Sequence, residues 1–108
     1  MANSRSDYSP SILQDDITHC FLCGRCDRKL DRHEVFPASN RQKSKRYGLW
    51  VTLCHYPCHL GKDGLQYNAD RAKGAKIFAQ VQAMRTYGWT IDDFRKKFGK
   101  NYLEGEEE

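Results

Sequence analysis

The chain has 108 residues, of which 39% are hydrophobic and 30% charged, and its net charge is +4. This length leaves room for one small domain, which buries too little surface to be comfortably stable by packing alone. No apolar run approaches the roughly 18 residues of a membrane span, and the first residues lack the apolar core of a signal peptide. We therefore expect an intracellular, cytoplasmic protein without a membrane partner, held together by a cross-link or a metal.

The two ends of the chain differ from its middle. Residues 1–14 contain several serines together with Asp, Asn and Pro, and residues 104–108 are four glutamates and a glycine. Polar or like-charged termini of this kind are typical of flexible segments. We predict a flexible leader at 1–14, a single domain at 15–103 and an acidic tail at 104–108.

Five cysteines lie in two groups, at 20–26 and at 54–59. An odd number of cysteines in a reducing compartment favours metal binding over disulfides. One group offers a C-x2-C pair and the other a C-x3-C pair about thirty residues later, and two such turns supply the four thiolates of a tetrahedral zinc site. We predict that a structural zinc ion is bound by four ligands: Cys20, Cys23, Cys54 and Cys58.

Other ligand sets stay open at this point. Tyr56-Pro57 lengthens the second turn, so that His55 or His59 could replace one thiolate. Cys26 could substitute for a ligand of the first pair, although a plain surface thiol is the simpler interpretation. A thiol redox role would suit C-x2-C alone but leaves the second cysteine pair without a purpose.

Between the cysteine groups, the sequence predicts two short strands joined by a basic loop. The first strand lies around His33–Phe36 and the second at Leu49–Leu53, and Pro37 and Asn40 mark the loop between them. Residues 25–46 hold eight basic and three acidic side chains. That balance suits a phosphate backbone, although a solvated loop explains the charge equally well.

Two helices are predicted in the last third of the chain, from about 70 to 98. The first begins with Asp70 as its cap and ends at Gly88. The second begins with a capping box formed by Thr90 and Asp93 and ends at Gly99. We expect both helices to be packing elements, the first burying an apolar stripe: Ile77, Val81 and Met84.

The residues with catalytic chemistry follow the order His33, Asn40, His59. In this setting the stretch RHEVFPASNRQKSKRYGLWVTLC, followed by CH, resembles the HNH endonucleases, in particular their phage and prophage members. The segment GKNYL near the C-terminus is also similar to that group. The resemblance covers about residues 20–103.

The resemblance implies an α+β fold with a ββα-metal core, in which a two-stranded hairpin and a helix hold one divalent cation, braced by zinc-bound cysteine pairs and followed by the C-terminal helices. It also implies a reaction, in which a strand histidine takes a proton from water and the hydroxide attacks a DNA phosphorus. The implied function is a phage-encoded, metal-dependent DNA endonuclease that nicks or cleaves duplex DNA. The alternative is a zinc-stabilised DNA-binding or adaptor module with weak or lost catalysis.

The implied roles follow the matching residues. His33 acts as the general base, and His59 binds Mg or Mn together with Glu34 or Asp31. Asn40 binds the cation or positions the base. Because family members carry a histidine pair or an Asp-His pair where this chain has His33-Glu34, a ligand role for His33 stays open. Gln66 stands where related sequences have a further histidine, so Asp63 is a substitute candidate. Four basic side chains are predicted to hold DNA phosphates: Arg41, Lys43, Lys45 and Arg46.

Overall fold

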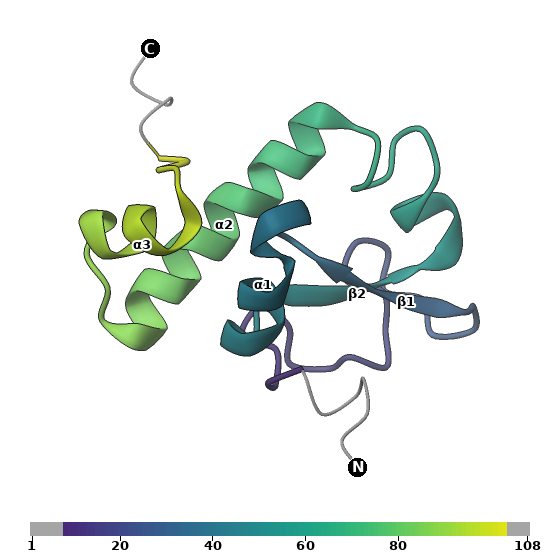
Figure 1. The fold of residues 1–108 in the computed structure, drawn as a ribbon. Helices are drawn as coiled ribbons and strands as arrows, with labels where there is room; N and C mark the ends of the chain where they lie inside the picture. The colour runs from purple at the N-terminus through teal and green to yellow at the C-terminus, as the bar shows by residue number, and fades with distance from the viewer. Residues whose placement is uncertain (1–7, 104–108) are drawn as a thin grey trace.

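The computed structural model describes residues 8–103 as an α+β fold built on a two-stranded antiparallel sheet (Figure 1). Within these residues, no helix combines the length and the apolar character needed to cross a membrane. In Figure 1, α2 runs diagonally between α3 on one side and α1 with the sheet on the other. The elements are β1 (Leu30–Glu34), a 3-10 turn (Ala38–Asn40), α1 (Arg41–Tyr47), β2 (Trp50–Cys54), a π-helical turn (His55–His59), α2 (Ala69–Tyr87) and α3 (Ile91–Phe98).

The sheet presents two different faces because successive side chains of a strand alternate. In the antiparallel register, Asp31 pairs with Leu53 and His33 with Val51. Every residue of β2 is buried, whereas β1 is only partly buried. Asp31 and His33 therefore share one face of β1, and Arg32 and Glu34 share the other.

The predicted basic loop between the strands is wrong, because Arg41–Tyr47 forms the helix α1. Its sequence consists largely of good helix formers, and Gly48 ends it in the left-handed conformation. Ser44 is fully buried in this helix, and its hydroxyl donates to the Phe36 carbonyl at 2.8 Å. The sequence shows no apolar stripe over this helix, because its buried side chains are Ser44 and Lys45.

Helix α2 begins and packs differently from the prediction. Its cap is Asn68, whose side chain accepts a hydrogen bond from the Arg71 N–H at 3.0 Å, rather than Asp70. The predicted core stripe of Ile77, Val81 and Met84 is only partly buried. The helix instead turns a neighbouring face, which carries two alanines, towards the core. The buried side chains of α2 are Ala79, Gln80 and Ala83.

The capping box of α3 is confirmed. The Asp93 N–H donates to the Thr90 hydroxyl at 3.0 Å, and the Thr90 N–H donates to the Asp93 carboxylate at 2.9 Å. This cap fixes the start of a helix that buries Phe94 and Phe98 against Phe36, with ring centroids 5.5 and 4.9 Å from that ring. The aromatic cluster joins α3 to the end of β1.

The N-terminal segment packs against the sheet from residue 8 onward. The Trp50 indole N–H donates to the Ser9 carbonyl at 2.8 Å, the Ile12 N–H donates to the Gly48 carbonyl at 2.9 Å, and Leu13 is buried. The packed part of the chain therefore begins before the predicted boundary at residue 15. The rest of the predicted leader, 1–7, and the acidic tail, 104–108, lie outside the described residues.

Gly48 is the glycine for which a side chain has the largest expected cost. Its φ is +73°, and an added Cβ would lie 2.3 Å from the Pro10 carbonyl oxygen. Gly88 has nearly the same φ, +71°, but nothing within 4 Å of such a Cβ. We expect Gly88→Ala to cost about 1–2 kcal/mol from the left-handed backbone alone, and Gly48→Ala clearly more. Urea unfolding of both variants tests this, and equal losses would contradict the steric argument.

Candidate metal centre and histidine cluster

Four cysteines from two separate turns meet at one point. Their sulfur atoms all lie within 4.8 Å of one another, so the group could hold a metal ion. The first turn precedes β1, and the second starts at the last residue of β2 and continues into the π-helical turn. Sites made of four cysteines are typical of zinc, and they stabilise small domains. The group consists of Cys20, Cys23, Cys54 and Cys58.

The electrostatics of these sulfurs suit a bound cation. Burial raises the pKa of Cys20, but hydrogen bonds from backbone N–H groups, including that of Cys23 at 3.4 Å, outweigh it and bring the pKa down to about 7. Burial and hydrogen bonding to the neighbouring sulfurs raise the pKa of Cys58. A divalent cation removes this conflict, because it binds all four as thiolates.

The remaining cysteine takes no part in this group. Cys26 is exposed and lies outside the four-sulfur cluster, as a plain surface thiol would. Neither His55 nor His59 replaces a thiolate in the cluster, because both rings turn to Asp31. The π-helical turn therefore serves two sites, placing Cys58 with the sulfurs and its histidines over β1.

Asp31 is the centre of a second polar cluster. Its Oδ2 atom lies 2.7 Å from His55 Nδ1 and 2.8 Å from His59 Nδ1. Burial raises the pKa of Asp31, but the hydrogen bonds from His59 and His55 outweigh it and hold that pKa below its usual value. The carboxylate is therefore ionised at neutral pH.

His33 completes this cluster from the same face of β1. Its ring lies across that of His59, with centroids 5.3 Å apart and planes at 72°. Burial lowers the pKa of His33 to about 4; His59 and Lys76 act in the same direction, and the negative charge of Glu34 acts against them. At neutral pH the imidazole is neutral and can accept a proton.

Glu34 is not brought together with the histidines. It lies on the opposite face of β1, where it accepts a hydrogen bond from the Tyr8 hydroxyl and lies 3.4 Å from the Arg41 guanidinium. Burial raises the pKa of Tyr8 to about 12, assisted by this carboxylate. Of the two carboxylates considered from sequence, only Asp31 lies beside both His55 and His59.

Asn40 also points elsewhere. Its side-chain amide donates to the Phe98 carbonyl at 2.9 Å and so ties the start of α1 to the end of α3. This contact gives Asn40 a positioning role in the fold. Asp63 and Gln66 are exposed in the segment after the His55–His59 turn.

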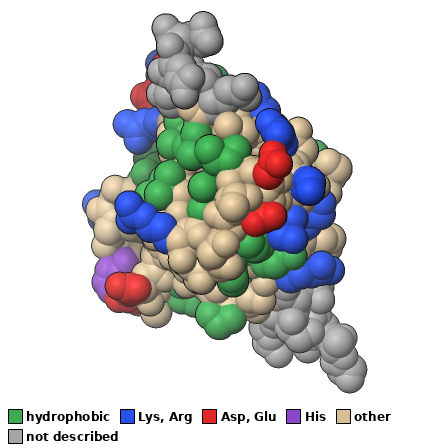
Figure 2. Space-filling view, turned by 90° about the vertical axis from the view of Figure 1, so that its left-hand side faces the viewer, with side chains coloured by type: hydrophobic (Ala, Val, Ile, Leu, Met, Phe, Trp, Pro, Cys, Tyr) green, Lys and Arg blue, Asp and Glu red, His purple; other side chains and the backbone are tan. Residues whose placement is uncertain are grey.

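The four basic residues predicted to hold phosphates divide into two pairs. Arg41 and Arg46 are exposed on α1. Lys45 is only 8% exposed, with its ammonium 5.1 Å from the Tyr8 ring centroid, and Lys43 donates to the Lys97 carbonyl. The face that carries α3 also shows lysine and arginine side chains, densest along one edge (Figure 2). The two arginines are better placed to meet a phosphate backbone than the two lysines.

Two residues of the cluster were not assigned to it from sequence. His55 was considered only as a substitute for a thiolate, and Lys76 was not considered. The signal for His55 was its place next to Cys54, which carries it to the same strand end as Asp31. Lys76 has no local signal, because only the packing of α2 brings its charge near enough to influence the pKa of His33. Comparison with protein-family models, with curated proteins and with solved structures finds no match to this chain.

Proposed function

We propose that the chain is a metal-dependent DNA endonuclease of the HNH type. The observation that carries this proposal is the convergence of Asp31, His33 and His59 on one face of a two-stranded sheet, beside a four-cysteine site. The strands β1 and β2 and the turn that carries His59 follow one another along the chain, with α1 between the strands and a turn where the ββα-metal core has its helix. The resemblance described above supports the same assignment.

In this proposal Asp31, His55 and His59 are the candidate ligands for a small divalent cation; within residues 8–103, only the four cysteines already lie close enough together to hold a metal ion. Ligands about 90° apart around Mg or Mn, with bonds of roughly 2.0–2.1 Å, are separated by about 3 Å. The Asp31 oxygen lies 2.7 and 2.8 Å from the two imidazole nitrogens. Mixed carboxylate and imidazole ligands suit Mn, and Mg uses the carboxylate with water and phosphate. When bound, such a cation stabilises the negative charge that develops on the phosphate and on the leaving oxygen.

His33 is the general base in this proposal. Its imidazole is neutral at the pH of the cell, because burial lowers its pKa to about 4. A phosphate next to the ring stabilises the imidazolium, which raises the pKa towards the range of an efficient base. His33 then takes a proton from a water molecule, the resulting hydroxide attacks the phosphorus, and the bond from phosphorus to the 3′ oxygen breaks, so that this oxygen leaves with the electron pair. His59 holds the ring from the side, and the exposed Arg41 and Arg46 attract the DNA backbone.

Nicking of supercoiled plasmid tests the proposal. We expect the zinc-loaded chain to produce nicked circles when Mg or Mn is added, and none without an added divalent cation. Zinc content, measured before and after the reaction, controls for loss of the structural metal. Tight plasmid binding without nicking in either metal would contradict the enzyme and favour a zinc-stabilised DNA-binding or adaptor module.

A further inference from the structure

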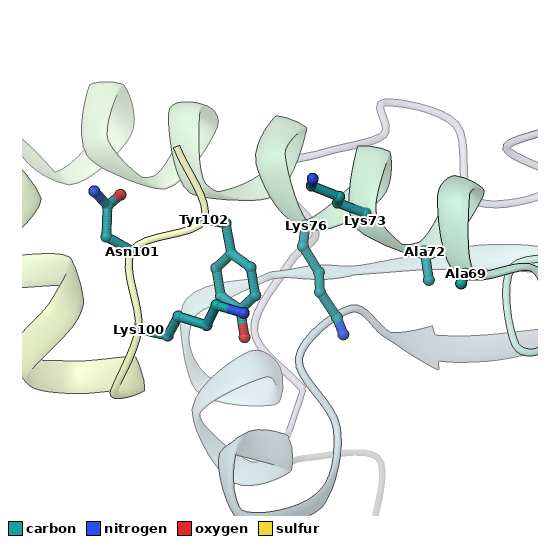
Figure 3. A pocket seen from close by; sticks show the side chains of 7 residues that line it. All are labelled: Ala69, Ala72, Lys73, Lys76, Lys100, Asn101 and Tyr102. Atoms are coloured by element: carbon teal, nitrogen blue, oxygen red, sulfur yellow. The ribbon is translucent and has the colours of Figure 1, made fainter. Parts of the chain in front are cut away.

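A cleft lies between the first half of α2 and the segment that follows α3 (Figure 3). Its volume is about 410 Å³, within the roughly 300–1,000 Å³ of small-ligand sites. Two alanines one turn apart on α2 leave the space open, and three lysines and a tyrosine surround it. We call it the lysine cleft; it is lined by Ala69, Ala72, Lys73, Lys76, Lys100 and Tyr102.

The lysine cleft combines positive charge with an aromatic ring. The ammonium groups of Lys76 and Lys100 lie 5.8 and 5.2 Å from the ring centroid of Tyr102. In Figure 3 the side chains of Lys76, Lys100 and Tyr102 lie on the same side of α2, and Asn101 also lines the cleft. Among residues 8–103, no acidic side chain lines the cleft. A ligand that carries both an anion and a planar ring matches this surface.

A buried glutamine fixes the ring in place. Gln80 is fully buried in α2, and its side-chain oxygen accepts the Tyr102 N–H at 2.8 Å while its amide donates to Asn101 at 2.8 Å. Tyr102 also packs against Phe36, with centroids 5.3 Å apart. The Tyr102 ring is therefore held in place before a ligand arrives, and it loses little conformational entropy when a ligand stacks on it.

We infer that the lysine cleft binds an unpaired nucleotide of a DNA strand. Lys76 and Lys100 hold its phosphate, and its base stacks on Tyr102. A base inside an intact duplex is paired and stacked, so it cannot reach this ring. The ligand class is thus single-stranded DNA, in preference to uninterrupted duplex. This inference goes beyond the proposed function, because it concerns binding and does not depend on cleavage.

The test is anisotropy of a labelled single-stranded oligothymidylate with the zinc-loaded chain and no added divalent cation. We expect tighter binding than to a blunt duplex of equal length. Lys76→Gln with Lys100→Gln should weaken binding by roughly tenfold or more. The matched control, Lys62→Gln with Lys96→Gln, removes the same charge from exposed positions outside the cleft and should weaken it much less.

Equal losses in the two double variants, or preferred binding to duplex, would overturn the inference. Tyr102→Phe keeps the ring and should bind like the wild type, whereas Tyr102→Leu should lose about tenfold. If circular dichroism shows that Tyr102→Leu is unfolded, the comparison of the two lysine double variants decides the test. A chain that binds single strands through the lysine cleft but never nicks DNA would refute the proposed enzyme alone. A nicking chain with no binding loss in Lys76→Gln with Lys100→Gln would refute the lysine cleft alone.

Discussion

Replacing Cys54 by serine is expected to abolish zinc binding by the four-cysteine group and to unfold the domain. Cys54 is fully buried at the end of β2 and belongs to the four-sulfur group. Structural zinc sites contribute roughly 10–16 kcal/mol, whereas whole domains are stable by only about 5–15 kcal/mol. Metal analysis should therefore find no bound zinc in Cys54→Ser, and circular dichroism should show no cooperative thermal transition.

The matched control is Cys26→Ser. Cys26 is exposed and lies outside the four-sulfur group, so this variant should keep one zinc ion and the melting temperature of the wild type. A folded Cys54→Ser variant with zinc still bound would contradict the four-cysteine site. Loss of zinc from Cys26→Ser would assign Cys26 as a ligand in place of one of the four.

Replacing His33 by alanine is expected to lower the rate of plasmid nicking by roughly 10²–10⁴-fold, the usual contribution of a general base. The ring lies against His59 on the face of β1 that carries Asp31. The variant should keep its zinc, because no cysteine ligand is changed. Single-turnover nicking with Mn, at equal zinc content, measures the effect.

Glu34→Gln is the control on the neighbouring position of the same strand. Its side chain lies on the opposite face, with Tyr8 and Arg41, and glutamine keeps the shape of glutamate and an oxygen that can accept from the Tyr8 hydroxyl. Nicking by Glu34→Gln should therefore stay close to the wild-type rate. If His33→Ala nicks normally while Glu34→Gln does not, the base assignment is wrong and the reactive face of β1 is the other one.

The cysteine group and the cap of α3 could be predicted because both depend on residues close together in sequence. Cys20 and Cys23 lie within one turn, as do Thr90 and Asp93, so spacing alone brings each pair into contact. The predicted strands were offset by a few residues, since strand ends depend on pairing partners as well as on local composition.

The histidine cluster could be predicted only in part. His33 and His59 were candidates from their residue types and order, but sequence could not choose between Asp31 and Glu34 as their carboxylate. The choice depends on which face of β1 lies towards the His55–His59 turn. The lysine cleft could not be predicted, because it forms where α2 meets a segment more than twenty residues further along the chain.

By itself, the sequence determined the small α+β domain, the two cysteine pairs and the polar residues available for a site. These features depend on composition and on spacings within single turns, where chain connectivity allows few alternatives. Only the tertiary structure decided that 41–47 is a helix, that α2 buries Ala79, Gln80 and Ala83, and that Asp31 joins His55 and His59. Each of these depends on which surfaces pack together, a choice made by the free energy of the whole core rather than by any local segment.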